Sequence, residues 1–294
     1  MSKLPTTRTQ GLQAKTGYYG SMNRFLAGCV QLTSKADVAE NLATCTRGIA
    51  EAARRGAQLV VLPENFAFVG MGENEKLELA ETLDADKPGR ILAALLEAAT
   101  RHSVWVIGGG MPEASPASGK VYNSCVAVSP AGRIAAVYRK VHLFDVQIPG
   151  AAEFCESRTV EPGRDVVVLE TPLAPVGLSI CYDVRFPELY RALSGRGARV
   201  VVVPAAFTLH TGKDHWHTLL RARAVENQVY VLAPAQYGRA NEKRVCYGHS
   251  LIADPWGTVI AEASDREGVI VGEIDLDFQD KVRRELPCLG HRRL

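Results

Sequence analysis

The pattern of hydrophobic and polar positions along this chain predicts alternating strands and helices. Continuous apolar runs, typical of strands buried on both faces, occur at 24–32, 57–63 and 104–110. Stretches with helical spacing occur at 37–55 and 88–101. Asp37 is placed to cap the first helix, and Gly56 to end it. The chain therefore opens with a strand–helix–strand unit.

The rest of the chain repeats this alternation, which favours a single α/β domain with two sheets and outer helices. Two strands at 122–128 and 133–139 are joined by the turn 129–132. Further strands are expected at 176–180, 199–204, 229–234, 247–252, 258–262 and 269–274, and helices from 187 and over 214–226. The polar segment 141–164 is unusually long for a connection, and such connections often carry functional residues.

Composition narrows the class of protein. The 294 residues include 34 Lys and Arg against 32 Asp and Glu, a net charge of +2, and both signs are spread along the chain. This excludes the broad basic surface expected of a protein that binds nucleic acid or an anionic membrane. The seven cysteines form no CxxC pair, and no apolar run is long enough to span a membrane. We therefore expect a reducing, cytoplasmic environment.

Residues 1–22 differ from the rest of the chain. They contain Lys3, Arg8 and Lys15 but no acidic residue, and they lack the apolar block of a secretory signal. We expect a flexible N-terminal leader over 1–22, followed by a single domain over 23–294. A weak organelle-targeting segment is the alternative interpretation of the leader.

Three chemically reactive side chains come directly after apolar strands. They are Glu64, Lys140 and Cys181, and the ends of strands are where open α/β sheets place their ligand sites. Taken one at a time, each has a structural explanation: Glu64 as a turn cap, Lys140 as a solvated strand end, Cys181 as core filler. Together they supply a base, a cation and a nucleophile.

Such a set is suited to hydrolysis of an amide or a nitrile through a covalent intermediate. Glu64 can take the proton of the Cys181 thiol, and we expect the helix that begins near Pro187 to favour the thiolate. Lys140 and the backbone N–H of Tyr182 can hold the oxyanion that forms when the carbonyl is attacked. This chemistry needs no cofactor and no metal.

Other candidate signals carry less weight. His215 and His217 are two residues apart on a predicted helix and so point about 200° from each other, which prevents them from sharing a metal there. The glycines at 108–110 are better explained by a close-packed turn than by a dinucleotide site. His142 and Asp145 imitate a cysteine-protease pairing, and we expect them to shape the loop that follows Lys140.

The residues around these positions resemble one family. LPENF, YRKVHLFDVQIPG and SICYDVRFPE are similar to the Glu, Lys and Cys motifs of the nitrilase superfamily of carbon–nitrogen hydrolases, in the family's order. The resemblance implies an α-β-β-α sandwich that dimerises into a four-layered α-β-β-α-α-β-β-α assembly. It gives the base role to Glu64, and it adds a second glutamate, Glu156, from the stretch FCES.

Further stretches resemble the Nit-type branch of amidases related to deaminated glutathione amidase. These stretches are HLFDVQIPG, AAFTLHTGKDHWHTLLRARAVENQ, AQYGRANEKRVCYGHS and DPWGTV. The branch implies hydrolysis of deaminated glutathione to 2-oxoglutarate and cysteinylglycine. An ω-amidase acting on 2-oxoglutaramate or 2-oxosuccinamate is the alternative, and a non-catalytic binding protein on the same scaffold is a second one. The resemblance also implies a homodimer or a higher homo-oligomer, with 221–228 at the contact.

Both candidate substrates carry carboxylates, so an arginine is expected near the cysteine. Arg185 is the nearest in sequence, and an ion pair with Glu188 or with a dimer partner explains it equally well. Phe207, Thr208 and Thr211 follow another apolar strand, and either a substrate pocket or ordinary loop packing accounts for them.

Overall fold

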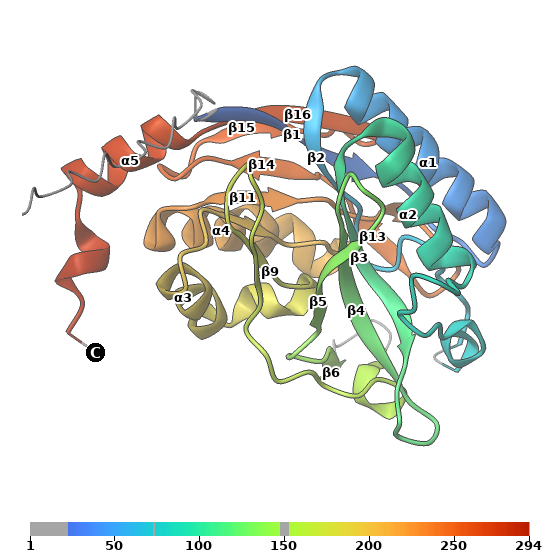
Figure 1. Ribbon diagram of the computed structural model, residues 1–294. Helices are drawn as coiled ribbons and strands as arrows, with labels where there is room; N and C mark the ends of the chain where they lie inside the picture. Colours follow the sequence, from blue (N-terminus) through green and yellow to red (C-terminus); the bar gives the residue numbers. More distant parts are fainter. Residues whose placement is uncertain (1–22, 73, 148–152, 294) are drawn as a thin grey trace, which may run out of the picture.

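Two six-stranded sheets pack face to face between two layers of helices (Figure 1). The computed structural model describes residues 23–72, 74–147 and 153–293, so the predicted leader 1–22 lies outside it. Helices α1 (Val38–Arg54) and α2 (Arg90–His102) cover the first sheet, and α3 (Pro187–Gly195) and α4 (Leu209–Asn227) cover the second. The α-β-β-α sandwich is therefore confirmed for one chain, while its pairing into a four-layered dimer stays a prediction.

The first sheet has a parallel centre and antiparallel edges. Strands β1, β2 and β3 run parallel, β4 and β5 continue as antiparallel neighbours, and β16 pairs antiparallel with β1. In spatial order the strands are β16 (Gly268–Asp275), β1 (Arg24–Gln31), β2 (Ala57–Val61), β3 (Trp105–Ala114), β4 (Val121–Val128) and β5 (Ile134–Arg139).

The second sheet has the same plan, with β9, β10 and β11 parallel at its centre. In spatial order its strands are β15 (Val259–Glu262), β14 (Leu251–Ala253), β11 (Tyr230–Ala233), β10 (Val200–Val202), β9 (Val176–Leu178) and β8 (Val168–Leu169). Two small hairpins are β6 (Asp145–Gln147) with β7 (Glu153–Cys155), and β12 (Tyr237–Arg239) with β13 (Val245–Tyr247). Helix α5 (Leu276–Glu285) follows β16.

Local chemistry explains where the elements begin and end. The Asp37 side chain accepts hydrogen bonds from the N–H groups of Ala39 and Glu40, so it caps α1 as predicted. Gly56 follows that helix with φ of 88°, a left-handed conformation that glycine adopts without steric cost. Pro187 is the first residue of α3, where its missing N–H has no intrahelical partner to lose.

Two expectations from the sequence were wrong in detail, and one helix was not expected. Helix α4 begins at Leu209 rather than 214, because Thr208 caps it and so offsets the weak helix propensity of the residues that follow. The glycines at 108–110 lie within β3, at an irregularity in its pairing with β4, and not in a turn. Helix α5 was not predicted, since its residues are mostly polar.

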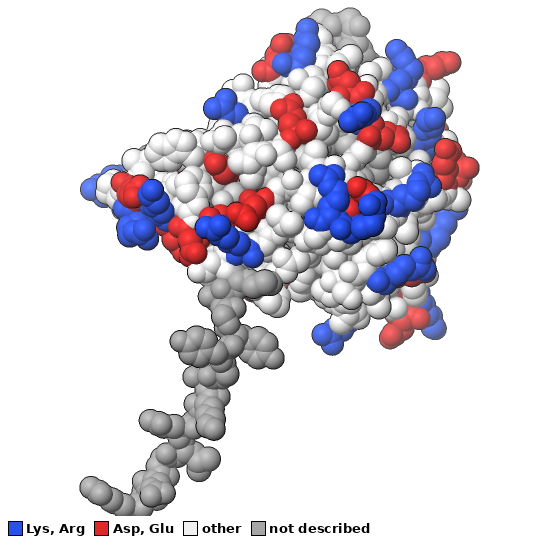
Figure 2. Space-filling model, turned by 90° about the horizontal axis from the view of Figure 1, so that it is seen from above, with Lys and Arg blue, Asp and Glu red and all other residues white. Residues whose placement is uncertain are grey.

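The surface carries charges of both signs side by side on the face that Figure 2 shows, in agreement with the nearly balanced composition. Among the residues that the structure describes, no helix is long and apolar enough to cross a membrane.

Candidate active site

Side chains from both sheets meet at one cavity of about 250 Å³. Glu64 follows β2, Lys140 follows β5, and Cys181 follows β9, and all three line this cavity. The two sheets therefore bring together the three strand-end residues predicted from the sequence, although Glu64 and Lys140 are 76 positions apart. Glu156, from the 3-10 turn Glu156–Arg158 after β7, lines the same cavity.

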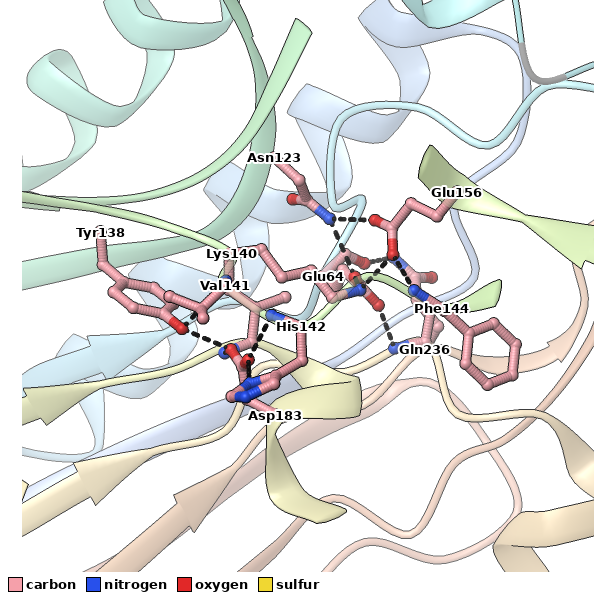
Figure 3. A network of polar contacts seen from close by, with 12 residues as sticks. Glu64, Asn123, Tyr138, Lys140, Val141, His142, Phe144, Glu156, Asp183 and Gln236 are labelled. Atoms are coloured by element: carbon pink, nitrogen blue, oxygen red, sulfur yellow. Dashed lines mark hydrogen bonds and ion pairs between the residues drawn. The ribbon is translucent and has the colours of Figure 1, made fainter. Parts of the chain in front are cut away.

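The Lys140 ammonium lies between two carboxylates (Figure 3). Its Nζ atom is 2.8 Å from Glu64 Oε1 and 2.8 Å from Glu156 Oε2. Only 2% of the lysine side chain is exposed, so solvent screens these contacts little. Because an ammonium has three N–H bonds, one remains to point at a ligand in the cavity.

Neighbouring donors fix both carboxylates. Asn123 Nδ2 is 3.0 Å from Glu64 Oε1 and 3.0 Å from Glu156 Oε1, so one amide group joins the two acids. The backbone N–H of Ala206 donates to Glu64 Oε2 at 3.1 Å, and that of Phe144 donates to Glu156 Oε2 at 2.8 Å. The carboxylates are thus held by groups from several separate segments, which makes their positions rigid.

Burial and charge act in opposite directions on this cluster. Burial alone would lower the pKa of Lys140, but the nearby charges of Glu156 and Glu64 outweigh it and raise the pKa well above its ordinary value. For Glu156, burial would raise the pKa, yet the adjacent Lys140 ammonium and the Phe144 N–H lower it to about 2. Lys140 therefore stays charged, and Glu156 stays ionised, through the physiological pH range.

The backbone at Cys181 is in an unusual conformation. Its φ is 47°, in the left-handed region that residues other than glycine seldom adopt. The Cys181 N–H donates to Pro204 O at 2.8 Å, and the preceding N–H of Ile180 donates to Asp183 Oδ2 at 2.8 Å. These bonds hold the cysteine at a sharp bend between β9 and the 3-10 turn Cys181–Arg185, where strain of this kind is typical of functional residues.

The thiol of Cys181 is a neutral group in this environment. Burial and the negative charge of Glu64 raise its pKa well above the ordinary value, and the opposing effect of Lys140 is smaller. The effect of the helix that begins at Pro187 on this thiol stays a prediction, since the raised pKa of Cys181 arises from desolvation and the adjacent carboxylate. Glu64 is placed to remove the proton as the sulfur reacts.

A third carboxylate, the buried Asp183, connects this bend to the loop after β5 (Figure 3). Its oxygens accept from Tyr138 Oη at 2.7 Å and from the His142 N–H at 3.1 Å, and His142 Nδ1 lies 2.7 Å from Oδ1. The His142 ring also stacks on Phe186 with centroids 3.7 Å apart. His142 thus contacts Asp183 instead of the thiol, which supports the expected structural role for this loop.

Gly110 allows the strand β3 to pass close to the cluster. Its φ is 96°, and a Cβ atom there would lie 2.7 Å from Asn123 Oδ1 and 3.1 Å from Glu64 Cγ. Only glycine fits both the conformation and the space.

Comparison with known proteins agrees with this geometry. Residues 26–284 match the model of the carbon–nitrogen hydrolase family. The chain belongs to this family. It is 46% identical over 274 residues to a deaminated glutathione amidase of Synechocystis, covering 92% of this chain and 99% of that protein. It is 43% identical over 272 residues to the human deaminated glutathione amidase, covering 91% of this chain and 82% of that protein.

A solved structure shows the same fold. Nit3 of Saccharomyces cerevisiae, described as a member of branch 10 of the nitrilase superfamily, superimposes with a TM-score of 0.83 at 32% identity, over 92% of this chain and 97% of that one. These findings confirm the predicted class of enzyme, a hydrolase acting on carbon–nitrogen bonds other than peptide bonds.

In this carbon–nitrogen hydrolase, the four residues expected at the substrate pocket all line the cavity. Arg185 has no ion pair with Glu188; its guanidinium lies 3.4 Å from His215 Nδ1 and 5.1 Å from the Phe207 ring centroid. Thr208 and Thr211 belong to the first turn of α4, and their hydroxyl oxygens are 2.9 Å apart. Thr208 therefore both caps the helix and faces the cavity.

Several residues that line the cavity are not predicted from the sequence. They are Lys76, Tyr122, Asn123, Phe144, Phe154, Asn241, Lys243 and Arg244. Asn123 gave a usable signal, since it and Ser124 are polar residues inside a strand that is mostly apolar. Tyr122 lies in the same predicted strand. The other residues sit in segments without periodicity, and only the tertiary structure brings them to the site.

A separate histidine cluster lies outside the cavity lining. His217 Nε2 and His249 Nδ1 are each 2.9 Å from Glu262 Oε1, and the three possible ligand atoms lie within 4.8 Å of one another. Burial would raise the pKa of Glu262, but the hydrogen bonds from both histidines outweigh it and lower the pKa. His215 faces Arg185 instead, so the two helix histidines do not share a site.

Proposed function

We propose that this protein is an amidase that hydrolyses deaminated glutathione to 2-oxoglutarate and cysteinylglycine through a thioester on Cys181. The observation that carries the proposal is the position of the buried Lys140 ammonium, 2.8 Å from both Glu64 and Glu156, in the cavity that Cys181 lines. The choice of substrate is supported by the names of the Synechocystis and human relatives.

Acylation follows from the protonation states. The neutral Cys181 thiol transfers its proton to Glu64 as the sulfur attacks the amide carbon, so no free thiolate has to be maintained. Negative charge then develops on the carbonyl oxygen. The third N–H of Lys140 and the N–H of Tyr182, in the first turn of its 3-10 helix, stabilise it, and each donor contributes about 3 kcal/mol.

The intermediate then collapses to products. Glu64 gives its proton to the leaving amine, and the carbon–nitrogen bond breaks to leave the acyl group on Cys181. Water enters, Glu64 takes one of its protons, and the hydroxide formed attacks the thioester carbon. The carbon–sulfur bond then breaks, the proton on Glu64 returns to the Cys181 sulfur, and the acid leaves and gives its own proton to solvent. Glu156 does not exchange protons in this scheme; with its pKa near 2 it remains a carboxylate that holds Lys140 in place.

Arg185 is the proposed clamp for the carboxylate of the acyl half. It is separated from Cys181 by one turn, faces the cavity and has no competing pair with Glu188. A guanidinium binds a carboxylate through two parallel hydrogen bonds, and the hydroxyls of Thr208 and Thr211 are further donors on the same side. Phe207 lies under the guanidinium and limits its movement.

Intact-mass spectrometry tests the covalent step. Deaminated glutathione mixed with the enzyme should give an acyl adduct of the 2-oxoglutaryl group, and Cys181→Ala should abolish it. Cys288→Ala removes an exposed cysteine and should leave the adduct unchanged. An adduct that persists in Cys181→Ala would refute the mechanism.

A substrate panel tests the assignment of the acyl group. Wild-type enzyme should release 2-oxoglutarate from deaminated glutathione with a higher kcat/KM than from 2-oxoglutaramate, while Glu64→Gln should lose both activities. A higher kcat/KM for 2-oxoglutaramate would favour the ω-amidase alternative. No release from either compound would favour the binding-protein alternative.

The proposed homodimer has a candidate surface on α4, the turn after β14 and strand β15. Large apolar side chains are exposed there, namely Val225 at 47%, Trp256 at 60% and Ile260 at 40%. By contrast, Arg223 within 221–228 is buried inside the chain, where its Nε donates to Val184 O at 2.9 Å. Sedimentation should show a dimer that Trp256→Glu dissociates; a wild-type monomer at micromolar concentration would contradict the proposal.

A further inference from the structure

A cluster of two histidines and one glutamate lies where helix α4 meets the edge of the second sheet. His217 belongs to α4, His249 lies between β13 and β14, and Glu262 is the last residue of the edge strand β15. His217 Nε2 and His249 Nδ1 are each 2.9 Å from Glu262 Oε1. None of these three residues lines the cavity of Cys181, so the proposed reaction leaves the cluster without a role.

The spacing of these atoms suits a metal ion. The three possible ligand atoms lie within 4.8 Å of one another. Zinc binds histidine nitrogen and carboxylate oxygen at about 2.0 to 2.2 Å, so the ligand atoms on one tetrahedral ion lie about 3 to 4 Å apart. Small rotations of the three side chains therefore bring all three atoms onto one ion. Imidazole ligands favour zinc over magnesium and calcium, which prefer oxygen ligands.

Hydrogen bonds between neighbouring residues hold the backbones of the three side chains together. The residue before His217 is Trp216, whose Nε1 donates to His249 O at 2.8 Å. The residue after Glu262 donates its backbone N–H to the carbonyl oxygen of the residue after His249, also at 2.8 Å. The three side chains therefore project from one connected framework, which lowers the entropy lost when an ion binds.

His249 is held in a conformation that few residues adopt. Its φ is 55°, in the left-handed region, and backbone strain of this kind is concentrated at functional sites. Its Nε2 atom lies 3.2 Å from Asp265 Oδ1. A carboxylate at this nitrogen favours the proton on Nε2, which leaves the lone pair of Nδ1 free to bind a metal. Histidines that bind zinc commonly have such a carboxylate behind them.

Negative charge surrounds the cluster. The Tyr247 ring stacks on the His249 ring, with centroids 4.5 Å apart. Burial and the negative charges of three nearby acids raise the pKa of Tyr247; the acids are Glu262, Asp265 and Asp214. The negative potential of these acids favours a divalent cation at the cluster. The Glu262 side chain is 36% exposed, so an ion can reach it from solvent.

We propose that His217, His249 and Glu262 bind one zinc ion, which fastens helix α4 to the edge strand β15. The fourth position of the tetrahedral ion is open to water. All three ligands belong to one chain, so the site depends neither on the proposed homodimer nor on the identity of the amide substrate. The alternative is a hydrogen-bonded cluster in which the two histidines only position the carboxylate.

Calorimetric titration with zinc chloride tests the site. The untagged full-length chain, freed of metal by a chelator and then dialysed, should bind one zinc ion per chain, and its melting temperature should rise with the zinc concentration. Cobalt(II) in place of zinc should give d–d absorption without a sulfur-to-metal charge-transfer band, because no cysteine is among the ligands. Absence of zinc binding would overturn the proposal and favour the hydrogen-bonded cluster. A sulfur-to-metal band would place the ion on a cysteine and overturn the assignment to these residues.

Single substitutions assign the binding to these side chains. His217→Gln, His249→Asn and Glu262→Gln should each lower the zinc affinity by about 100-fold or more, and asparagine tolerates the positive φ at position 249. Asp265→Asn keeps all three ligands and should lower the affinity by about 10-fold, the lower end of the range for a residue behind a ligand. His215→Gln makes the same chemical change in the same helix outside the cluster and should leave the affinity unchanged. Equal zinc affinity in wild type and His249→Asn would overturn the assignment.

Discussion

Replacing Lys140 by methionine should reverse the way in which stability depends on pH around the active site. The substitution keeps a long apolar side chain but removes the ammonium that lies 2.8 Å from both Glu64 and Glu156. Removing one partner from a buried ion pair costs about 3 to 5 kcal/mol of stability, because the remaining charge has no compensation. We expect a loss of this size at neutral pH.

The two carboxylates then repel each other. Their oxygens each lie 2.8 Å from the same nitrogen. At a separation of about 5 Å and an effective dielectric constant of about 20, the repulsion is about 3 kcal/mol. That is enough for the pair to take up one proton near neutral pH. The folded variant then binds more protons than its unfolded chain, so its free energy of unfolding falls as the pH rises.

The wild-type protein behaves in the opposite way. The pKa of Glu156 is lowered to about 2, so the stability from its ionisation is fully present above the unfolded value near 4.5 and is lost only as the pH falls toward 2. Between about pH 5.5 and 7.5 this contribution is constant. The stability difference between wild type and variant should therefore grow with pH, by at most about 1.4 kcal/mol per unit.

Urea denaturation at several pH values, at one protein concentration, measures this difference. Lys281→Met is the matched control, since its side chain is 58% exposed and its ion pair with Glu285 is 4.0 Å long. An exposed pair of this kind contributes about 0 to 1 kcal/mol. If the wild-type and Lys140→Met curves stay parallel across the pH range, the reasoning about the paired carboxylates is refuted.

Three further predictions concern the same site. Gly110→Ala should cost about 2 kcal/mol or more and lower kcat, because its Cβ would meet Asn123 Oδ1 at 2.7 Å. Gly119 also has a positive φ but has open space around it, so Gly119→Ala should cost only about 1 kcal/mol; equal urea midpoints would contradict this. The rate at which iodoacetamide alkylates Cys181 should rise steadily from about pH 7 to 10, because burial and Glu64 raise the pKa of this thiol. A rate that reaches a plateau below about pH 8 would disprove the neutral thiol. Asp183→Asn removes an acceptor that several donors share, so it should lower the free energy of unfolding by about 1 to 3 kcal/mol and also lower kcat. An unchanged melting temperature and unchanged turnover would exclude the anchoring role.

The sequence alone was sufficient for the class of fold and for three residues that meet in one cavity. Continuous apolar runs mark buried strands because every side chain on both faces is removed from water, and reactive residues directly after such runs lie at the edge of a sheet. Glu64, Lys140 and Cys181 are identified in this way, since each needs only its own strand. The motif resemblance then added Glu156, which lies in a segment without periodicity.

Only the tertiary structure decided how these groups are held and charged. The Ala206 N–H that fixes Glu64 is 142 positions away, and the Asp183 carboxylate that fixes the cysteine bend receives donors about 40 positions earlier. The ionisation of the thiol depended on burial and on a neighbouring acid, which a helix start in the sequence does not reveal. Arg244 reaches the cavity through a hairpin anchored at Gly70 and Thr208. Periodicity reports which face of a segment is buried, but the contacts between distant segments, and the electrostatic environment they create, arise only when the chain is folded.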